Sequence, residues 1–592
     1  MKLLIVILGP FMLLVATAVV SSAQAPVQNI AFPTTAGTCT STFGVACNGS
    51  NTPFFADRPD FSCATAPSSV NITMCVSGQA VEFFNSTTGA MVGSSTALRN
   101  WVTANLGATA VAGAEPHVVF DPFINPSGKP AGAFIFVCSC AHIGGASQGN
   151  PIVGVTTSAD PTGKWNSRQL SSTTYGDMTL FVSFSANGMY VMGVDPTSVP
   201  NYVDIMWAWG TPAQANLSSS LAAPDVVFDK TSSPPPSYFA TPVLDYTAGK
   251  STSTPDVFVS NCDGIALACQ GAPRLVTLTF NEVTWTSGTT ASLAKYQVNT
   301  GNYYGGAANL GVQPGNYRLR DAESHFPGYG VELSNKHVYT SAPTGKQGND
   351  YNGFKAYDID LSNPSHPTIK TTFTVGGETK FDAVFPATVA DSAGNVFWVF
   401  SESSATTFVN PAVMVLANGT KFLQGPFLLN SPTASGTIAT AGADCSVRTN
   451  CVGFAPPGSP AQVGVVVSGS FTGTLQFEDS KGSSIAATPA GGGATTTNAA
   501  SAGAWTLPTA GLAGVRVRAS ALSSGKPAIN LQAVAGSVYP WCRTTNPPAF
   551  QGNFSSAQID PSNGNNVWVY GVAAFSNVKC QWTTEAVQFT WR

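Results

Sequence analysis

Short apolar runs alternate with polar turn residues along most of this chain. An apolar strand, a turn rich in Asp, Ser, Asn or Gly, and a second apolar strand form one pattern that returns at least five times. Its copies lie at 117–137, 180–191, 329–339, 387–400 and 556–570. A β-hairpin that repeats every several tens of residues is typical of a solenoid, a propeller or another repeat architecture. The pattern therefore predicts an all-β repeat protein.

The turn after the first strand of each unit marks the spacing of the repeat. The third interval between markers is stretched by a Gly- and Asn-rich loop at 299–313, and the last interval is longer by about 110 residues, the size of a small domain. We therefore expect an inserted domain before the final unit. The marker residues are Asp121, Ser185, Asp245, Ser334, Asp391 and Asp560.

The composition changes inside the long interval. From about Ser435 to Gly536 aromatic residues become rare, and Ala, Gly, Ser and Thr dominate. Segments at 463–478, 504–520 and 529–533 alternate apolar and polar residues and are joined by Gly-rich loops, which predicts a β-sandwich. The expected organisation is a signal peptide at 1–25, propeller blades 1–6 at 26–433, an inserted β-sandwich at 434–537 and a last blade closing the ring at 538–592.

The repeat units fit a β-propeller. Radially arranged four-stranded sheets leave only short edges, which keeps a long all-β chain soluble. The spacing favours seven blades and also permits six or eight. Sustained helical periodicity is absent, because Gly and Pro interrupt the Ala-rich runs. We expect the apolar strand that starts each unit to line the centre of the ring.

The start of the chain predicts export. Lys2 precedes an apolar run at 3–20, and small residues follow up to Ala23 and Ala25, as in a secretory signal peptide. A membrane anchor is the alternative, although the run is barely long enough to span a bilayer. No later segment has the length and hydropathy of a membrane span. We expect a secreted, extracellular or cell-surface protein, with the periplasm as the alternative.

The overall charge excludes one class of partner. Charged residues make up 9% of the 592 residues and the net charge is -4. Such a chain has no broad basic field to attract nucleic acid or anionic lipid. Glycans or surface proteins are the partners that a neutral, hydroxyl-rich surface would suit.

The chain has 12 cysteines, which fits an oxidising compartment. The residues of the CxC pair Cys138 and Cys140 share one face of a strand, and we expect their geometry not to suit a direct bridge. No CxxC motif supports a metal site built from cysteines. The disulfide candidates are Cys39 with Cys47, Cys63 with Cys75, Cys262 with Cys269, Cys445 with Cys451, and Cys542 with Cys580.

Two resemblances add to this interpretation. The order of the phrases at 85–89, 115–121 and 157–165 resembles a family of secreted bacterial β-propellers of largely unassigned function. The segment 470–478 resembles β-sandwich modules of bacterial surface and phage tail proteins, which implies an accessory domain for adhesion or carbohydrate contact. The segment 158–165 is similar to the Asp-box turn of sialidase-like propellers, in which the carboxylate caps backbone N–H groups and the aromatic ring packs beneath.

Position in the predicted propeller selects the candidate site residues. The first residues of the innermost strands would face the mouth of the central channel. Imidazole and carboxylate groups that converge there could bind a divalent metal or act as an acid and a base. The alternative is that they tie adjacent blades by bonding exposed backbone amides. These residues are Glu115, His117, Asp177, Glu323, His325 and Asp382.

These features favour an exported, non-catalytic binding or adhesion protein that contacts glycans or cell-surface partners. No complete catalytic constellation and no cofactor motif is evident in the sequence. The alternative is an extracellular hydrolase or lyase that acts on polysaccharide at the channel mouth, with Glu115, His117, Glu323 and His325 as its functional groups.

Overall fold

The computed structural model describes most of the strands and turns of the chain, and it is nearly all β. The described residues are 27–37, 61–78, 80–108, 116–124, 132–141, 150–170, 179–194, 204–211, 217, 221–228, 240–241, 243–248, 250, 254–261, 275–286, 290–302, 311–312, 318–320, 328–333, 336–344, 352–363, 366–377, 381–404, 410–417, 427–428, 433–447, 449–455, 462–489, 494–509, 511–534, 549–550, 555–574 and 582–590.

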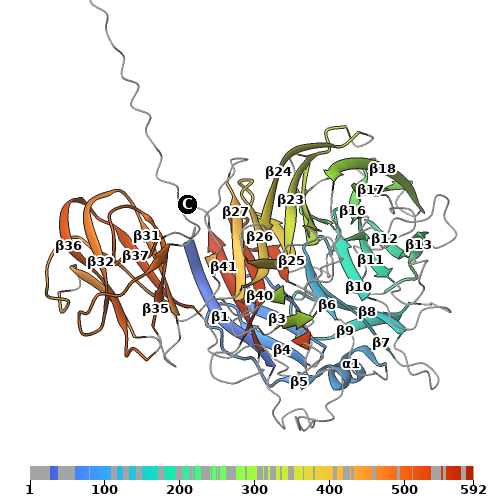
Figure 1. The fold of residues 1–592 in the computed structure, drawn as a ribbon. Helices are drawn as coiled ribbons and strands as arrows, with labels where there is room; N and C mark the ends of the chain where they lie inside the picture. The colour runs from blue at the N-terminus through green and yellow to red at the C-terminus, as the bar shows by residue number, and fades with distance from the viewer. Residues whose placement is uncertain are drawn as a thin grey trace, which may run out of the picture.

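Seven sheets of four or five strands follow one another along the described chain (Figure 1). The first three contain β2 (Phe61–Thr65), β3 (Ile72–Ser77), β4 (Ala80–Asn85) and β5 (Thr96–Ala97); β6 (His117–Asp121), β7 (Ala133–Ala141), β8 (Asn150–Thr156) and β9 (Trp165–Gln169); and β10 (Thr179–Phe184), β11 (Gly188–Val194), β12 (Asp204–Gly210) and β13 (Asp225–Phe228).

The next three sheets contain β14 (Ala240–Thr241), β16 (Asp256–Asn261), β17 (Leu275–Thr286) and β18 (Thr290–Asn302); β15 (Val243–Asp245), β21 (Gly328–Leu333), β22 (His337–Thr344), β23 (Gly353–Asp360) and β24 (Thr368–Gly376); and β25 (Asp382–Ala390), β26 (Val396–Ser403), β27 (Asn410–Leu416) and β28 (Phe427–Leu428). In these three sheets the meander is interrupted once, because β15 leaves the fourth sheet and pairs parallel with β21 of the fifth.

The seventh sheet joins the two ends of the chain. It is formed by β39 (Ser556–Ile559), β40 (Asn566–Ala574) and β41 (Trp582–Thr590), and β1 (Val27–Gly37) pairs antiparallel with β41 as its outer strand. Residues 26–433 were expected to form blades 1–6, and the pairing of β1 with the last sheet was not predicted. This pairing is non-local, so the local pattern of apolar residues contains no signal for it.

Seven inner strands form a closed ring, in which β15 and β21 both belong to the fifth sheet and the fourth sheet contributes none of the seven. They contact one another in the order β2, β6, β10, β15, β21, β25 and β39, and β39 returns to β2. This is the arrangement of a β-propeller. Strands β25 and β26 are buried over their whole length, as expected for strands covered by neighbouring sheets on both faces.

The predicted hairpins share one kind of turn after the first strand. At Asp121, Asp245, Asp391 and Asp560 the carboxylate Oδ1 accepts a backbone N–H from two residues further on, over 2.7–3.0 Å. At Ser185 the hydroxyl accepts the N–H of the second residue over 2.9 Å. These buried side chains replace a backbone partner in a tight turn, which explains why Asp and Ser recur there. Ser334 lies outside the described residues.

Side-chain bonds close the seam between the first and the seventh sheet. The amide of Gln558 accepts the N–H of Thr65 over 3.1 Å and donates to the Thr65 carbonyl over 2.8 Å. The Thr65 hydroxyl also lies 2.6 Å from the Tyr570 hydroxyl, and the Cys63 N–H donates to Ser556 over 3.0 Å. All these groups lie between β2 and the last sheet, so they stabilise the closed ring directly.

A second body of two facing sheets follows the sixth sheet, at the left of Figure 1. Its sheets pack around their own apolar core, which includes Val465, Leu475, Phe477, Val517 and Leu531. The strands are β29 (Thr433–Thr437), β37 (Ala528–Val534), β31 (Gln462–Ser468), β35 (Gly503–Pro508) and β33 (Thr488–Pro489); and β30 (Cys451–Phe454), β36 (Val515–Gly525), β32 (Phe471–Asp479) and β34 (Asn498–Ala499).

Two smaller elements complete the described fold. Helix α1 (Leu98–Leu106) buries Leu98, Trp101, Val102 and Leu106, and it ends at Gly107, whose φ of 67° is left-handed. The sequence shows no sustained helical periodicity, because the nine residues of α1 are too few to display one. A small sheet contains β19 (Gly311–Val312), β20 (Arg318–Arg320) and β38 (Ala549–Phe550).

Removal of residues 27–37 tests the role of β1. We expect the melting temperature to fall by roughly 5 °C or more relative to a chain that begins at residue 26, because β41 loses its outer partner and becomes an open edge. Differential scanning calorimetry measures the change. Equal melting temperatures for the two chains would contradict this role.

Candidate functional site

The structure describes two of the six predicted channel-mouth residues. Their four companions, Glu115, Asp177, Glu323 and His325, lie outside the described residues.

His117 begins β6 and is buried, with 1% of its surface exposed. Its ring packs against that of Phe181 on the first strand of the next sheet, with the ring centroids 5.1 Å apart. Burial lowers the pKa of His117 to about 3, so the imidazole is neutral at physiological pH. His117 therefore takes part in packing between the second and third sheets.

Asp382 begins β25 and is fully buried. Its Oδ1 accepts the backbone N–H of Asn352 over 2.7 Å and the side-chain Nδ2 of the same residue over 2.9 Å. The Ala383 N–H donates to the Asn352 carbonyl over 3.0 Å. Asn352 directly precedes β23, so these bonds connect the fifth and sixth sheets in the way that the tying alternative describes.

A small cavity lies among inner strands of the ring. This cavity of about 10 Å³ lies between β2, β6, the end of β15 and β39, which is the room needed for about one water molecule. A sugar ring does not fit into this space. The lining residues are Ser62, Cys63, Val118, Val119, Phe120, Leu244, Tyr246, Ser556, Ala557 and Gln558.

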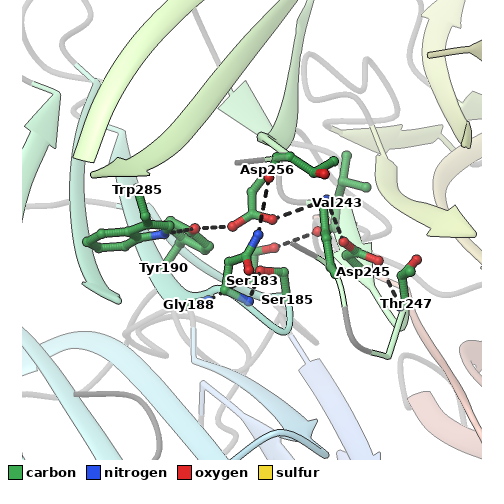
Figure 2. A network of polar contacts seen from close by, with 12 residues as sticks. Ser183, Ser185, Gly188, Tyr190, Val243, Asp245, Thr247, Asp256 and Trp285 are labelled. Atoms are coloured by element: carbon green, nitrogen blue, oxygen red, sulfur yellow. Dashed lines mark hydrogen bonds and ion pairs between the residues drawn. The ribbon is translucent and has the colours of Figure 1, made fainter. Parts of the chain in front are cut away.

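Figure 2 shows a buried polar network between the third and fourth sheets. The Tyr190 hydroxyl on β11 donates to Asp256 Oδ2 on β16, and it accepts the indole N–H of Trp285 on β17 over 2.6 Å. The aromatic ring of Tyr190 packs edge to face on Phe258 at 4.9 Å. Tyr190 therefore connects two sheets through both its hydroxyl and its ring.

Lys250 carries the positive charge of this network. Its Nζ lies 2.7 Å from Asp245 Oδ2 and 3.1 Å from Asp256 Oδ1, and all three side chains are only 3% exposed. Burial raises the pKa of Asp256, while Lys250 and the Tyr190 hydrogen bond oppose that rise. Burial, together with the charge of Asp256, raises the pKa of Tyr190 well above 10. Lys250 thus offsets two carboxylates that water does not reach.

Two buried glutamates differ from these paired groups. Burial raises the pKa of Glu282 on β17 to about 7 against the opposing charge of Lys250, and burial raises the pKa of Glu402 on β26 to about 8. One carboxyl oxygen of each has no hydrogen-bond partner among the described residues. The Glu402 carboxyl is therefore mostly protonated at neutral pH, whereas the Glu282 carboxyl is about half protonated there.

No three His, Cys, Asp or Glu side chains gather closely enough to hold a metal ion in the part of the chain that the structure describes. The tryptophans Trp207, Trp209, Trp398 and Trp568 are fully buried, so they belong to the core rather than to a surface for stacking on sugars.

The disulfide predictions are partly tested. The pairs Cys63–Cys75 and Cys445–Cys451 are confirmed. Cys138 and Cys140 also form a disulfide, so the expectation that their geometry prevents a bridge was wrong: their Cα atoms, on one face of β7, lie 5.3 Å apart, which is within bonding range. The predicted pairs at Cys39 with Cys47, Cys262 with Cys269, and Cys542 with Cys580 lie outside the described residues.

The Asp-box-like segment forms the turn that its sequence indicates. Asp160 Oδ1 accepts the backbone N–H of Thr162 over 2.9 Å, and the buried indole of Trp165 donates to the Pro161 carbonyl over 3.0 Å. The segment stabilises the end of β8 and the start of β9. Its role in this structure is to hold a turn.

The network around Lys250 was missed by sequence reasoning. Asp245 was recognised only as a turn marker, and Lys250, Asp256 and Tyr190 carried no motif. A lysine a few residues beyond a marker aspartate, in a chain with so few charges, was the available signal.

Comparison with known proteins leaves the family open. No protein-family profile and no curated protein matches the chain. Among solved structures, a glycoside hydrolase family 43 arabinoxylan arabinofuranohydrolase from Bacillus subtilis is 10% identical, with 78% of this chain and 87% of that chain covered and a TM-score of 0.22. BlXynB from Bacillus licheniformis is 11% identical, with 80% and 96% covered and a TM-score of 0.22.

A protein of unknown function from Dyadobacter fermentans is 9% identical, with 70% of this chain and 95% of that chain covered and a TM-score of 0.23. Similarities at these TM-scores assign neither a family nor an activity to this chain.

Replacing Lys250 tests the network. Lys250→Met is expected to lower the free energy of unfolding by about 3–5 kcal/mol, because it leaves Asp245 and Asp256 buried without a counter-charge. Denaturant unfolding measures the loss. Adding Asp256→Asn should recover part of it, and a double variant no more stable than Lys250→Met would contradict this account.

Glu402 should make stability depend on pH. The unfolded carboxyl has a pKa near 4.5 and the folded one about 8, so stability falls as the pH rises between these values, by about 1.4 kcal/mol per pH unit, and is then constant. Glu402→Gln should remove this slope in unfolding measured from pH 4 to 9. Glu282→Gln is the matched variant and should remove a slope that ends near pH 7. Parallel profiles for Glu402→Gln and the unaltered protein would refute the assignment.

Proposed function

We propose that the seven sheets of the ring are the seven blades of a β-propeller, and that residues 434–537 form a β-sandwich inserted between the sixth and seventh blades. The seven successive sheets support the blade number, and the closed order of contacts among the inner strands supports a closed ring. The separate apolar core of the two facing sheets supports an independent inserted domain.

The protein is, in this proposal, an exported glycan-binding protein that works without catalysis. The observation that carries it is the use of the ring's ionisable groups. Asp382, Lys250 and Asp256 are buried and bonded between neighbouring sheets. Groups committed in this way support the ring, and they leave recognition to its outer surfaces and to the sandwich.

Export is supported by the disulfides, because such bonds persist mainly in oxidising compartments. Within the described residues, no helix has the length and apolar character needed to cross a membrane.

A second candidate function is hydrolysis of extracellular polysaccharide. The observation that favours it is the raised pKa of Glu282, about 7, and of Glu402, about 8. A carboxyl that stays protonated near neutral pH is what a glycosidase needs as its general acid. These two glutamates lie in different sheets, and both are buried.

A glycan array and a panel of polysaccharide-degradation assays separate the two functions. Binding proteins retain polysaccharide unchanged, and we expect retention on the array with no new reducing ends after prolonged incubation. Release of reducing ends that Glu402→Gln or Glu282→Gln abolishes would reject the binding proposal in favour of hydrolysis. If the protein neither retains nor degrades any polysaccharide of the panel, both proposed functions are rejected.

A further inference from the structure

The outer face of one sandwich sheet carries a cluster of charged and amide side chains. This sheet has the strand order β30-β36-β32-β34 and lies at the far left of Figure 1. Residues Val515, Val517, Leu475 and Phe477 of its two central strands are buried in the core. Because side chains alternate along a strand, Arg516, Arg518, Gln476 and Glu478 share the opposite, outer face.

Glu478 is the centre of this cluster. Its Oε2 accepts Nε of Arg516 over 2.8 Å, and its Oε1 accepts Nε and Nη2 of Arg518 over 2.9 and 2.6 Å. The Glu478 side chain is 3% exposed, and its pKa is lowered because the two guanidinium groups outweigh the opposing effect of burial. Two positive charges therefore share one carboxylate, which leaves one positive charge uncompensated within this trio.

The two arginines differ in the number of N–H donors that remain without a hydrogen-bond partner. Arg518 also donates to Gln476 Oε1 and, over 3.4 Å, to the Gly442 carbonyl, so it is largely committed within the domain. Arg516 uses only Nε, and its Nη1 and Nη2 have no partner among the described residues, while 21% of the side chain is exposed. Glu478 thus fixes the guanidinium of Arg516 through Nε and leaves the Nη1 and Nη2 groups of Arg516 available to a ligand.

Glycines leave space around this fork. Gly453 on the edge strand β30 lies directly opposite Arg516, and a Cβ atom placed there would meet no atom within 4 Å. At Gly482 a Cβ atom would lie 2.7 Å from Nη2 of Arg516, so only glycine lets the guanidinium lie over that turn. The other nearby carboxylate, Asp479, is bonded to the backbone N–H groups of Lys481 and Ser483.

From this geometry we infer that Arg516 is the anchor of a binding site for a carboxylated sugar, with the open surface beside Gly453 as the place where the sugar ring lies. A guanidinium fork with both Nη groups available pairs with a carboxylate through two parallel hydrogen bonds. Gln476 and the exposed Asn498, which pair across β32 and β34, supply amide groups on the same sheet for sugar hydroxyls. This inference rests on the proposed glycan binding and specifies an acidic glycan as its ligand.

Galacturonic acid and its neutral counterpart galactose are the probes for this site. Titration calorimetry on the whole protein should show binding of galacturonic acid and of trigalacturonate at least tenfold tighter than binding of galactose. Arg516→Ala should weaken trigalacturonate binding at least tenfold, and Arg516→Lys should weaken it less, because lysine keeps the charge without the fork. Acetate and sulfate serve as competitors that test whether any anion suffices.

Two further variants keep the test independent of folding. Gly453→Phe places a bulky ring beside Arg516 and leaves every arginine in place, so it should also abolish binding. Lys481→Ala removes one positive charge from the neighbouring exposed turn and should leave binding unchanged. Melting temperatures within about 2 °C of the unaltered protein show that a loss is local.

Equal binding of galacturonic acid and galactose, or an equal loss in Lys481→Ala and Arg516→Ala, would overturn the site. Binding of neutral polysaccharide that survives Arg516→Ala would overturn the site and leave the proposed function standing. Binding of galacturonic acid that depends on Arg516, without retention of any polysaccharide, would support the site and reject the proposed function.

Discussion

Closure of the ring between its first and last sheets is the constraint on which this structure depends. Thr65 and Gln558 are 493 residues apart, yet their backbone and amide groups bond to each other in both directions. The apolar faces of β2 and β39 would meet water if the seam opened. Strand β1 reinforces the same seam from outside, because it brings the start of the chain onto the edge of the last sheet. Stability of the ring is therefore a property of the whole chain.

Polar side chains between neighbouring sheets hold the ring together. Lys250 with Asp245 and Asp256, the Tyr190 hydroxyl, and Asp382 with Asn352 all join one sheet to the next. Buried charges cost free energy unless they are paired, so each of these groups demands a specific alignment of its neighbours. Glu282 and Glu402 solve the same problem differently, because burial keeps the proton on the carboxyl.

The parts of the fold that could be predicted from the sequence are those set by local pattern. The hairpins follow from apolar alternation and from turn residues such as Asp391, whose carboxylate caps its own turn. Helix α1 was missed because its nine residues contain too little periodicity, and β1 was missed because its partner lies at the other end of the chain. The Cys138–Cys140 bond was misjudged from ideal strand geometry.

The sequence by itself determined an all-β chain of repeated hairpins, a long interval that indicated an extra domain, and cysteine pairs close along the chain. These features depend on residues near one another in sequence. Only the tertiary structure decided which ionisable groups meet. Lys250 reaches Asp256 in one turn region, but Tyr190 reaches it from 66 residues away, and Arg516 reaches Glu478 across 38 residues. Such encounters depend on how whole sheets pack, which no short stretch of sequence specifies.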